Sequence, residues 1–339
     1  ITMAVLVAGG AGYIGSHTAI ELLESGYEVV IVDNLSNSNS IVVDRIKELS
    51  KKPVKFYNID IRNKDEMHVV FKENNIESII HFAALKAVGE SVEKPIEYYS
   101  NNLISTLNLF ELMREYGVKK FVFSSSATVY GDPHTCPILE DFPLSVTNPY
   151  GRTKLMIEQM LVDISKADKS LDIALLRYFN PVGAHKSGRI GEEPNGVPSN
   201  LMPYITKIAV GKLKELSVYG NDYPTHDGTG VRDYIHVLDL AAGHVKALQK
   251  LEENPGLVVY NLGTGKGYSV LDLVKAFSKA SGKEIPYKIV GRRAGDVAMC
   301  YADSSKAEKE LGWKAKYELE EMCEDSWRWQ SMNPNGYEE

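Results

Sequence analysis

The sequence predicts an α/β protein with a doubly wound parallel sheet and a smaller mixed α/β domain. Three observations lead to this prediction. Short apolar runs alternate with amphipathic helical stretches through the first half of the chain. A long segment rich in Pro, Gly, Asn and Ser then separates this half from shorter, mixed elements. The length of 339 residues suits either one large α/β unit or two domains.

The expected elements of the first half alternate strictly between strand and helix. Expected strands cover residues 5–8, 28–32, 54–58, 78–83, 121–125 and 173–178, and expected helices include 13–25, 101–116 and 150–166. Residues 181–203 are expected to be irregular, and 258–262 to form one more buried strand that returns to the first sheet. We therefore expect a first domain over 1–178, with a returning segment near 235–263, interleaved with a second domain over 179–339.

Composition and charge narrow the class of protein. Hydrophobic residues make up 44% and charged residues 24%, as in ordinary globular proteins. The net charge of -7 argues against a nucleic-acid partner, and no apolar run is long enough to cross a membrane. The chain also starts without the features of a secretory leader. Cys136, Cys300 and Cys323 form neither a metal-ligand pattern nor a disulfide framework, so we expect no metal and a reducing cytoplasm.

A glycine-rich segment follows the first expected strand and opens the first expected helix. Its sequence, residues 9–15, satisfies both G-x-G-x-x-G and G-x-x-G-x-x-G spacing. Glycines allow a tight turn, and they let backbone N–H groups reach a pyrophosphate at the helix N-terminus. Glycine-rich turns are common, so the signal depends on its context. That context, strand then turn then helix, is that of a Rossmann-type dinucleotide site.

Asp33 ends the second expected strand, near the distance expected for a carboxylate that binds the adenosine ribose. A carboxylate there repels a 2′-phosphate, and no Arg follows in residues 34–40. The alternative is an ordinary aspartate at the end of a strand. Position, order and spacing together favour NAD over NADP.

Tyr150 and Lys154 lie at i and i+4, which places them on the same face of a helix. A Tyr becomes a useful base if its pKa falls from about 10 towards 7, which takes roughly 4 kcal/mol. A Lys cation about 5 Å away supplies on the order of 3 kcal/mol at an effective dielectric near 20. The positive nicotinamide ring of NAD+ would provide the remainder, so we expect Tyr150 to be phenolate-like chiefly when the oxidised cofactor is bound. This spacing alone is more often coincidental. The Ser124-Ser125-Ser126 run at the end of an upstream strand supplies a hydroxyl for the same site and favours a catalytic role.

The chain resembles the extended short-chain dehydrogenase/reductase family, most closely its UDP-galactose 4-epimerase branch, from residue 5 to about 329. Residues 9–17, 81–91, 124–131, 178–181 and 220–236 carry the resemblance. The resemblance implies a UDP-hexose substrate, inversion at sugar C4 through a 4-keto intermediate, and a role in galactose metabolism and nucleotide-sugar supply. It also implies the catalytic residues Ser126, Tyr150 and Lys154.

The same resemblance assigns two sets of contacts. Those to NAD would be made by Gly9, Gly12, Tyr13, Ile14, Gly15, Asp33, Asn34, Asp60, Ile61, Phe82, Ala83, Lys86, Asn101, Ser124, Tyr150, Lys154 and Tyr178. Those to the UDP-sugar would be made by Ser126, Tyr150, Phe179, Asn180, Asn200, Leu201, Tyr219, Arg232, Arg293, Asp296 and Cys300. The two arginines suit a pyrophosphate. They could equally be surface ion pairs, with Asp233 and Asp296 as their partners.

Related chemistries divert the 4-keto intermediate. A 4,6-dehydratase or a UDP-glucuronate decarboxylase carries acidic residues directly after the strand-end hydroxyl, whereas Ala127 and Thr128 stand there in this sequence. Epimerisation is therefore favoured, with a UDP-glucuronate 4-epimerase as the runner-up. An NAD-sensing scaffold without turnover is a third alternative, although such proteins usually lose the Tyr or the Lys.

Two finer expectations concern the sugar and the assembly. Some relatives carry a bulky Tyr where Cys300 stands. The smaller thiol should leave room for an N-acetyl group, although a small buried cysteine is the alternative interpretation. Expected helices 101–116 and 150–166 carry more apolar surface than one sheet face requires, which suggests a homodimer.

Overall fold

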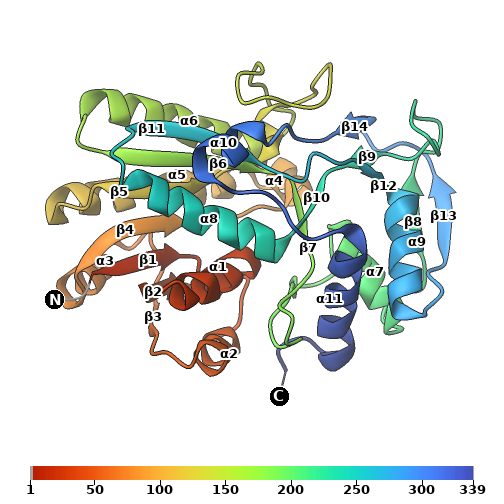
Figure 1. The fold of residues 1–339 in the computed structure, drawn as a ribbon, viewed down its shortest axis with the longest axis horizontal. Helices are drawn as coiled ribbons and strands as arrows, with labels where there is room; N and C mark the ends of the chain where they lie inside the picture. Colours follow the sequence, from red (N-terminus) through yellow and green to blue (C-terminus); the bar gives the residue numbers. More distant parts are fainter. Residues whose placement is uncertain (1–2, 339) are drawn as a thin grey trace.

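A seven-stranded parallel sheet forms the core of the protein, whose computed structural model describes residues 3–338 (Figure 1). The strand order is β11-β6-β5-β4-β1-β2-β3. In chain order the strands are β1 (Ala4–Ala8), β2 (Glu28–Asp33), β3 (Lys55–Asn58), β4 (Ile76–His81), β5 (Lys120–Ser124), β6 (Asp172–Tyr178) and β11 (Leu257–Leu262). The chain builds outward from β1 in both directions, which confirms the predicted doubly wound, Rossmann-type sheet.

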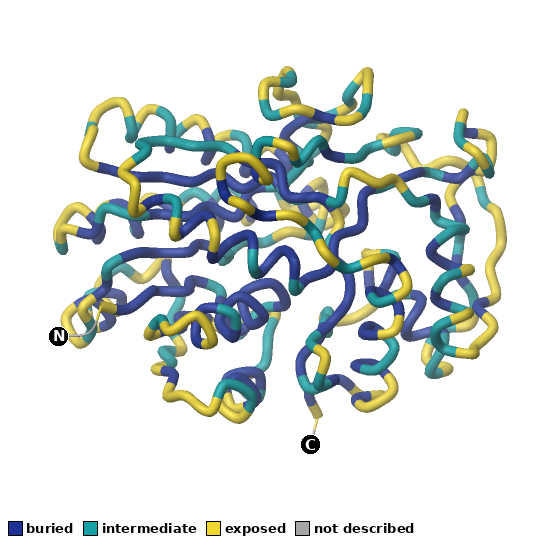
Figure 2. Tube along the Cα trace, viewed as in Figure 1, coloured by how far each residue is buried: buried dark blue, intermediate teal, exposed yellow. Residues whose placement is uncertain are grey.

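Helices cover both faces of this sheet. On one face lie α1 (Tyr13–Glu24), α2 (Ile41–Ser50) and α8 (Val237–Leu251), and on the other lie α3 (Lys64–Glu73), α5 (Pro95–Tyr116) and α6 (Pro149–Ala167). Strand side chains alternate between the two layers, so that Val5 and Val7 pack with α1 while Leu6 packs with α5 and α6. Because both faces are covered, the central strands are almost entirely buried, as Figure 2 shows, whereas the edge strand β3 is partly exposed.

A second region lies beside the carboxyl ends of these strands. It contains three short sheets, with strands β7 (Asn180–Val182), β8 (Leu216–Tyr219), β9 (Val231–Arg232), β10 (Tyr234–His236), β12 (Tyr268–Ser269), β13 (Tyr287–Val290) and β14 (Met299–Cys300). Helices α7 (Leu201–Ala209), α9 (Val270–Ser281) and α11 (Leu319–Met332) pack around an apolar core of their own. The predicted smaller mixed α/β part is therefore present.

The chain passes between the two regions more than once. After β6 it enters the second region at β7, and it then returns through α8 to β11, which pairs with β6 in parallel. The expectation that residues 258–262 rejoin the first sheet is confirmed. The short helix α10 (Ser305–Leu311) contacts β11 before the chain ends on α11.

Several element boundaries differ from the sequence prediction. Helix α5 begins at Pro95 rather than residue 101, because Pro is favoured at the first turn of a helix, where its missing N–H costs nothing. Strand β4 ends at His81, so Phe82 follows the strand. Strand β7 and helix α7 reduce the irregular segment to residues 183–200. Among residues 3–338 no helix has the length and apolar character needed to span a membrane.

Candidate active site

The glycine-rich turn between β1 and α1 is shaped for close backbone contact. Gly9 has φ +82°, and a Cβ there would lie 2.7 Å from the backbone nitrogen of Ala83. A Cβ on Gly15 would lie 2.3 Å from the Gly9 carbonyl oxygen. No side chain caps α1, whose N-cap is Gly12, so its first N–H groups remain for an anion. The turn and helix terminus therefore fit a dinucleotide pyrophosphate.

Tyr13 and Ile14 open α1 and are buried. The Tyr13 hydroxyl donates a 2.6 Å hydrogen bond to the carbonyl of Gly183, at the start of the irregular segment of the second region. Burial raises the pKa of this hydroxyl well above its usual value, so Tyr13 stays neutral. The first turn of α1 is thus tied directly to the second region.

Asp33 lies at the carboxyl end of β2, one strand away from the glycine turn. Its carboxylate accepts hydrogen bonds from Ala11 N at 3.1 Å, Leu35 N at 2.9 Å and the Ser38 hydroxyl at 2.9 Å. These bonds hold the carboxylate beside the turn, and an ionised carboxylate has further acceptor capacity for a ribose. Asn34 follows it and is exposed. The geometry suits the predicted role of Asp33.

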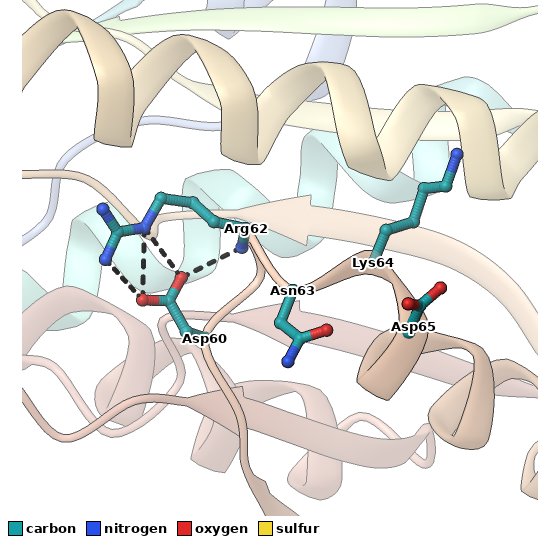
Figure 3. A pocket seen from close by; sticks show the side chains of 5 residues that line it. All are labelled: Asp60, Arg62, Asn63, Lys64 and Asp65. Carbon is teal, nitrogen blue, oxygen red and sulfur yellow. Dashed lines mark hydrogen bonds and ion pairs between the residues drawn. The ribbon is translucent and has the colours of Figure 1, made fainter.

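Asp60 borders a pocket near the carboxyl end of β3 (Figure 3). The Arg62 guanidinium donates to both carboxylate oxygens of Asp60, with a shortest distance of 2.6 Å, and holds the pKa of that carboxyl below its usual range. Ile61 between them is buried. Asp33 pairs with Asn58 across the two strands, so this pocket adjoins the Asp33 end of the site. The Arg62 charge is therefore already paired with a carboxylate.

The segment after β4 forms the other wall of the glycine turn. The backbone nitrogens of Phe82 and Ala83 both donate to the Ala8 carbonyl, at 2.8 and 3.0 Å. Lys86 lies exposed a few residues further on, and Asn101 faces this side from α5, where its amide donates to Asn102. The predicted cofactor residues of this segment therefore border one edge of the sheet.

The predicted catalytic pair occupies the first turns of α6. The Asn148 side chain caps this helix, and Pro149 occupies its first turn, which fixes where Tyr150 emerges. Tyr150 and Lys154 are both buried, and the Lys154 Nζ lies 5.9 Å from the centroid of the Tyr150 ring. Lys154 donates a 2.8 Å hydrogen bond to the Ser124 carbonyl at the end of β5. The helix and strand end are thereby joined.

Hydroxyl groups complete this cluster. Ser126 follows β5 and lies near enough to the Tyr150 hydroxyl to lower its pKa, while the Ser126 Oγ accepts a hydrogen bond from Thr128 N. The Ser124 hydroxyl donates to the Tyr178 hydroxyl at 2.9 Å. Ser126, Tyr150 and Lys154, which the sequence placed in separate segments, meet at the carboxyl end of β5.

The electrostatics of the pair differ from the sequence expectation. Burial raises the pKa of Tyr150 above its usual value, with Tyr178 and Tyr98 adding to the effect and the Ser126 hydrogen bond opposing it. Burial also lowers the pKa of Lys154 to about 7, helped by the Lys86 charge and opposed by Glu158. Desolvation penalises both charged forms, and the simple two-charge argument omitted it. In the protein without bound cofactor, Lys154 therefore does not lower the pKa of Tyr150.

The predicted substrate residues lie across from this cluster on the second region. Phe179 and Asn180 lead into β7, Asn200 and Leu201 start α7, Tyr219 ends β8, Arg232 lies in β9, and Arg293, Asp296 and Cys300 lie on or just before β14. The Arg232 Nη1 donates to the carbonyls of Val231 and Val297, both at 2.8 Å. The structure therefore orients this guanidinium through the backbone.

The sequence allowed two surface ion pairs, Arg232–Asp233 and Arg293–Asp296, and the structure contains only the second of them. Asp233 is fully buried and accepts hydrogen bonds from Thr264, Gly265 and Ala302, so it is not the partner of Arg232. Arg293 does pair with Asp296, at 2.9 Å, and it lies over the Tyr219 ring at 5.3 Å from the centroid.

Asn200 is exposed at the start of α7, whereas Cys300 is partly buried. The Asn200 amide donates to the Glu192 carboxylate at 3.2 Å. Cys300 pairs with Arg232 in the β14–β9 ladder, and it packs against the apolar cluster that also includes Ala127 and Phe179. Burial raises the pKa of the Cys300 thiol to about 12, so it stays protonated. Cys300 therefore behaves as a small apolar wall residue.

Sequence reasoning missed Glu158 and Arg177, which form a buried ion pair directly behind the catalytic cluster. Glu158 lies four residues after Lys154, so the same i, i+4 spacing that singled out Tyr150 and Lys154 could have found it. Arg177 gave no such signal, because its partner lies on a different element.

Known proteins resemble this chain over nearly its whole length. A family model described as GDP-mannose 4,6 dehydratase matches residues 6–326. A UDP-glucose 4-epimerase of Bacillus subtilis is 65% identical over 335 residues, 99% of each chain. A crystal structure of UDP-glucose 4-epimerase from Bifidobacterium longum, in complex with NAD+ and UDP, is 59% identical, with a TM-score of 0.95 over 98% of this chain and 100% of that one. The structure of the UDP-Glc/GlcNAc 4-epimerase from Campylobacter jejuni is 38% identical, with a TM-score of 0.86 over 97% and 99% of the two chains.

Proposed function

This chain belongs to the UDP-glucose 4-epimerases, within the extended short-chain dehydrogenases/reductases, and from that premise we propose that it interconverts UDP-galactose and UDP-glucose. One observation carries the proposal. Tyr150, Lys154 and Ser126 meet at the carboxyl end of β5, on the side that faces the second region. A Tyr base, a Lys cation and a hydroxyl donor are the groups that oxidation of a sugar hydroxyl requires.

The residues after Ser126 support epimerisation over elimination. Ala127 and Thr128 begin a short 3-10 turn (η1, Ala127–Val129) beside Ser126, and neither carries a carboxyl group. Without an acid there, the protein lacks the group that would remove a C5 proton and expel water from a 4-keto sugar. The intermediate then has only its return to an alcohol available, which is the epimerase outcome.

The cofactor is NAD, held by the glycine turn and Asp33. Bound there, NAD would supply the reversible acceptance of a hydride from sugar C4. The Tyr150 oxygen takes the proton of the 4-hydroxyl, and it returns this proton at the end of the cycle. The Ser126 hydroxyl hydrogen-bonds the same sugar oxygen. Lys154, fixed by the Ser124 carbonyl, supplies the positive charge beside Tyr150.

The second region would hold the UDP group through the pyrophosphate. Arg232 donates from one nitrogen to two backbone carbonyls, so its other N–H groups remain available for phosphate oxygens. The exposed Arg293 can exchange its Asp296 partner for the second phosphate. A firmly gripped UDP lets the sugar itself turn over and present its other face. We assign the nucleotide-sugar part to residues 179–339, and the NAD part to 1–178 with the returning segment near 235–263.

We also propose activity on the N-acetylated pair, UDP-GlcNAc and UDP-GalNAc. The small Cys300 side chain in the wall near Ala127 supports this extension, since a larger ring there would fill the space beside the sugar. The similarity to the Campylobacter jejuni UDP-Glc/GlcNAc 4-epimerase points in the same direction. The cell would use the enzyme in galactose metabolism and nucleotide-sugar supply. The three free cysteines fit the reducing cytoplasm as its location.

A homodimer is the proposed assembly. Val92, Ile96, Ile104 and Leu107 are exposed on α5 and on the short helix α4 (Val88–Glu93), so they form an apolar face. Only Met156 is comparably exposed on α6, so the apolar surface expected from 150–166 is mostly buried in the chain itself. Ultracentrifugation of Ile96→Asp should show monomers, while the exposed Ile289→Asp in β13 should remain dimeric. A monomeric unmodified protein would contradict the proposal.

The activity is tested by incubating the NAD-loaded protein with UDP-galactose, UDP-glucose, the N-acetylated pair and UDP-glucuronate, followed by separation of the C4 epimers. We expect UDP-galactose and UDP-glucose to reach the same mixture from either side. Conversion of UDP-glucuronate alone would favour the rival epimerase. Binding of NAD with no epimer formed, and no absorbance change near 340 nm, would indicate a sensor and overturn the proposal.

A further inference from the structure

The face of α6 that carries Tyr150 and Lys154 continues to a third polar residue, Glu158. The spacing is i, i+4 and i+8, which keeps all three side chains on one side of the helix. Glu158 is as deeply buried as the other two. Buried carboxylates are costly unless they are paired and hydrogen-bonded, so a role is expected for this one.

The three side chains contact three consecutive serines at the end of β5. Lys154 donates to the Ser124 carbonyl at 2.8 Å, and the Ser125 hydroxyl donates to Glu158 Oε2 at 2.6 Å. The Tyr150 hydroxyl lies near Ser126, whose hydroxyl opposes the rise in the Tyr150 pKa. Two successive helical turns therefore fix two successive strand-end residues just before the hydroxyl that meets the substrate. A shift of Ser125 would move Ser126 directly, because they are neighbours in the chain.

Arg177 holds the Glu158 carboxylate in place. Its Nε and Nη2 donate to both Glu158 oxygens, with a shortest distance of 2.6 Å, and both side chains are almost fully buried. Arg177 lies in β6, next to β5 in the sheet, and its Nη1 also donates to the Tyr130 hydroxyl and the Glu140 carbonyl. The ion pair therefore joins β6, α6 and the segment that follows Ser126.

We propose that Glu158 is a positioning residue for the epimerase reaction, which acts through Ser125 to hold Ser126 at the Tyr150 hydroxyl. The inference rests on the proposed function and deepens it. The side-chain hydrogen bonds of Glu158 go to Ser125 and Arg177 and to none of the predicted NAD or UDP contacts, so its loss should affect the reacting groups more than the binding groups. The expected signature is a lower kcat with little change in KM.

The test uses Ser125→Ala, which removes one hydroxyl and leaves the Glu158–Arg177 pair intact. We expect kcat for UDP-galactose to fall roughly ten- to a hundredfold, since small misplacements of reacting groups have effects of this size. KM, and the affinities for UDP and for NAD+ measured by calorimetry, should stay within about twofold of the unmodified protein. Thr206→Val is the matched control, because Thr206 makes a buried 3.0 Å contact with the side chain of Gln330 in the second region. That variant should lose similar thermal stability and keep its kcat.

Glu158→Gln and the double variant complete the test. If Glu158 acts through Ser125, adding Ser125→Ala to Glu158→Gln should produce no further loss of kcat, whereas independent effects would multiply and contradict the proposal. An unchanged kcat in Ser125→Ala, or an equal loss in Thr206→Val, would also overturn it. The unmodified protein in the same assay reports separately on the proposed function: if it has no activity, the epimerase assignment itself fails.

Discussion

Lys154 and Arg293 are predicted cations on the two sides of the site, and the structure holds them very differently. Lys154 is 4% exposed and bonded to a backbone carbonyl of the sheet. The Arg293 side chain is 60% exposed, and its partner is a carboxylate three residues away on the same loop. A solvent-exposed pair of this kind contributes little to stability and is easily exchanged. The predicted catalytic cation is therefore fixed by the fold, whereas Arg293, a proposed UDP contact, is held only by a pair that a ligand can replace.

The contrast has a functional consequence. Epimerisation needs a proton acceptor and a hydride path in one place for every turn of the sugar, which suits buried, multiply bonded side chains. The UDP-sugar must enter, turn and leave, which suits exposed side chains with replaceable partners. Substitutions on the buried side should therefore slow all sugars alike, while substitutions on the exposed side should distinguish between sugars.

Tyr150→Phe is the largest expected effect and tests the buried side. Loss of the base should lower turnover of every UDP-sugar by about 10²- to 10⁴-fold, the usual range for a general base. NAD should remain bound, because the cofactor contacts are spread over the glycine turn and β2. Tyr260→Phe makes the same change at a fully buried tyrosine of β11 and should leave turnover unaltered. Near-normal turnover in Tyr150→Phe would show that Tyr150 is not the base and would contradict the proposed mechanism.

Lys154→Met should have the next largest effect on kcat, and this effect should depend on pH. Burial holds the pKa of Lys154 near 7, so in the unmodified protein its charge is present below pH 7 and is lost as the pH rises through that value. The Met variant lacks the charge at every pH. Its deficit in kcat, roughly a hundredfold from a Coulomb energy of about 3 kcal/mol, should therefore be largest near pH 6 and shrink towards pH 9.

The exposed Lys166 on the same helix provides the control for that measurement. Lys166→Met makes the same chemical change away from the site and should leave the pH–rate profile in place. A ratio between the unmodified protein and Lys154→Met that stayed constant from pH 6 to pH 9 would rule out the electrostatic role of Lys154. Weaker binding of NAD+ to Lys154→Met should accompany the kinetic effect.

Asp33→Ser tests the proposed NAD site at the carboxyl end of β2. The carboxylate should repel a 2′-phosphate, so its removal should reduce the preference for NAD+ over NADP+ by about ten- to a hundredfold. Calorimetry with both cofactors measures this preference directly. Asp33→Asn separates charge from hydrogen bonding, because it keeps an acceptor for Leu35 N and removes the charge. Equal affinity of the unmodified protein for both cofactors would contradict the assignment.

The sequence predicted best those features whose parts lie close together in the chain. The glycine turn, Asp33 at the end of β2 and the Tyr150–Lys154 spacing all depend on local patterns, and the structure places them where the patterns implied. The carbonyl partners of Arg232 and the hydrogen-bond donors to Asp233 come from distant segments, such as Val297 and Ala302. No local pattern predicts such partners, so an ion pair was a fair hypothesis for Arg232 and the wrong one.

The same limit applies to the charges. The raised pKa of Tyr150 and the lowered pKa of Lys154 both originate in burial, which depends on how α6 packs against the sheet. Spacing along a helix predicts the distance between two side chains, but it does not predict how deeply each of them is buried. The resemblance to a family supplied the exposed substrate residues, which the residue types and spacing alone did not single out.

Cys300→Tyr has the most selective expected effect and tests the proposed UDP-sugar side of the site. Cys300 lies in β14 beside Arg232, a proposed UDP contact, and packs against the cluster that includes Ala127, which follows Ser126, so we expect a larger side chain there to affect the sugar rather than the cofactor. Overfilling a packed site costs about 1–3 kcal/mol, which corresponds to roughly a ten- to hundredfold loss. The loss should fall on UDP-GlcNAc and UDP-GalNAc, whose acetyl group needs the space, and spare UDP-galactose. Cys300→Ala, which keeps the wall small, should retain both activities. If the unmodified protein does not convert the acetylated sugars, or if Cys300→Tyr slows both pairs equally, Cys300 does not set the width of the pocket, and the division between a catalytic side common to all sugars and a UDP-sugar side that distinguishes them fails at this position.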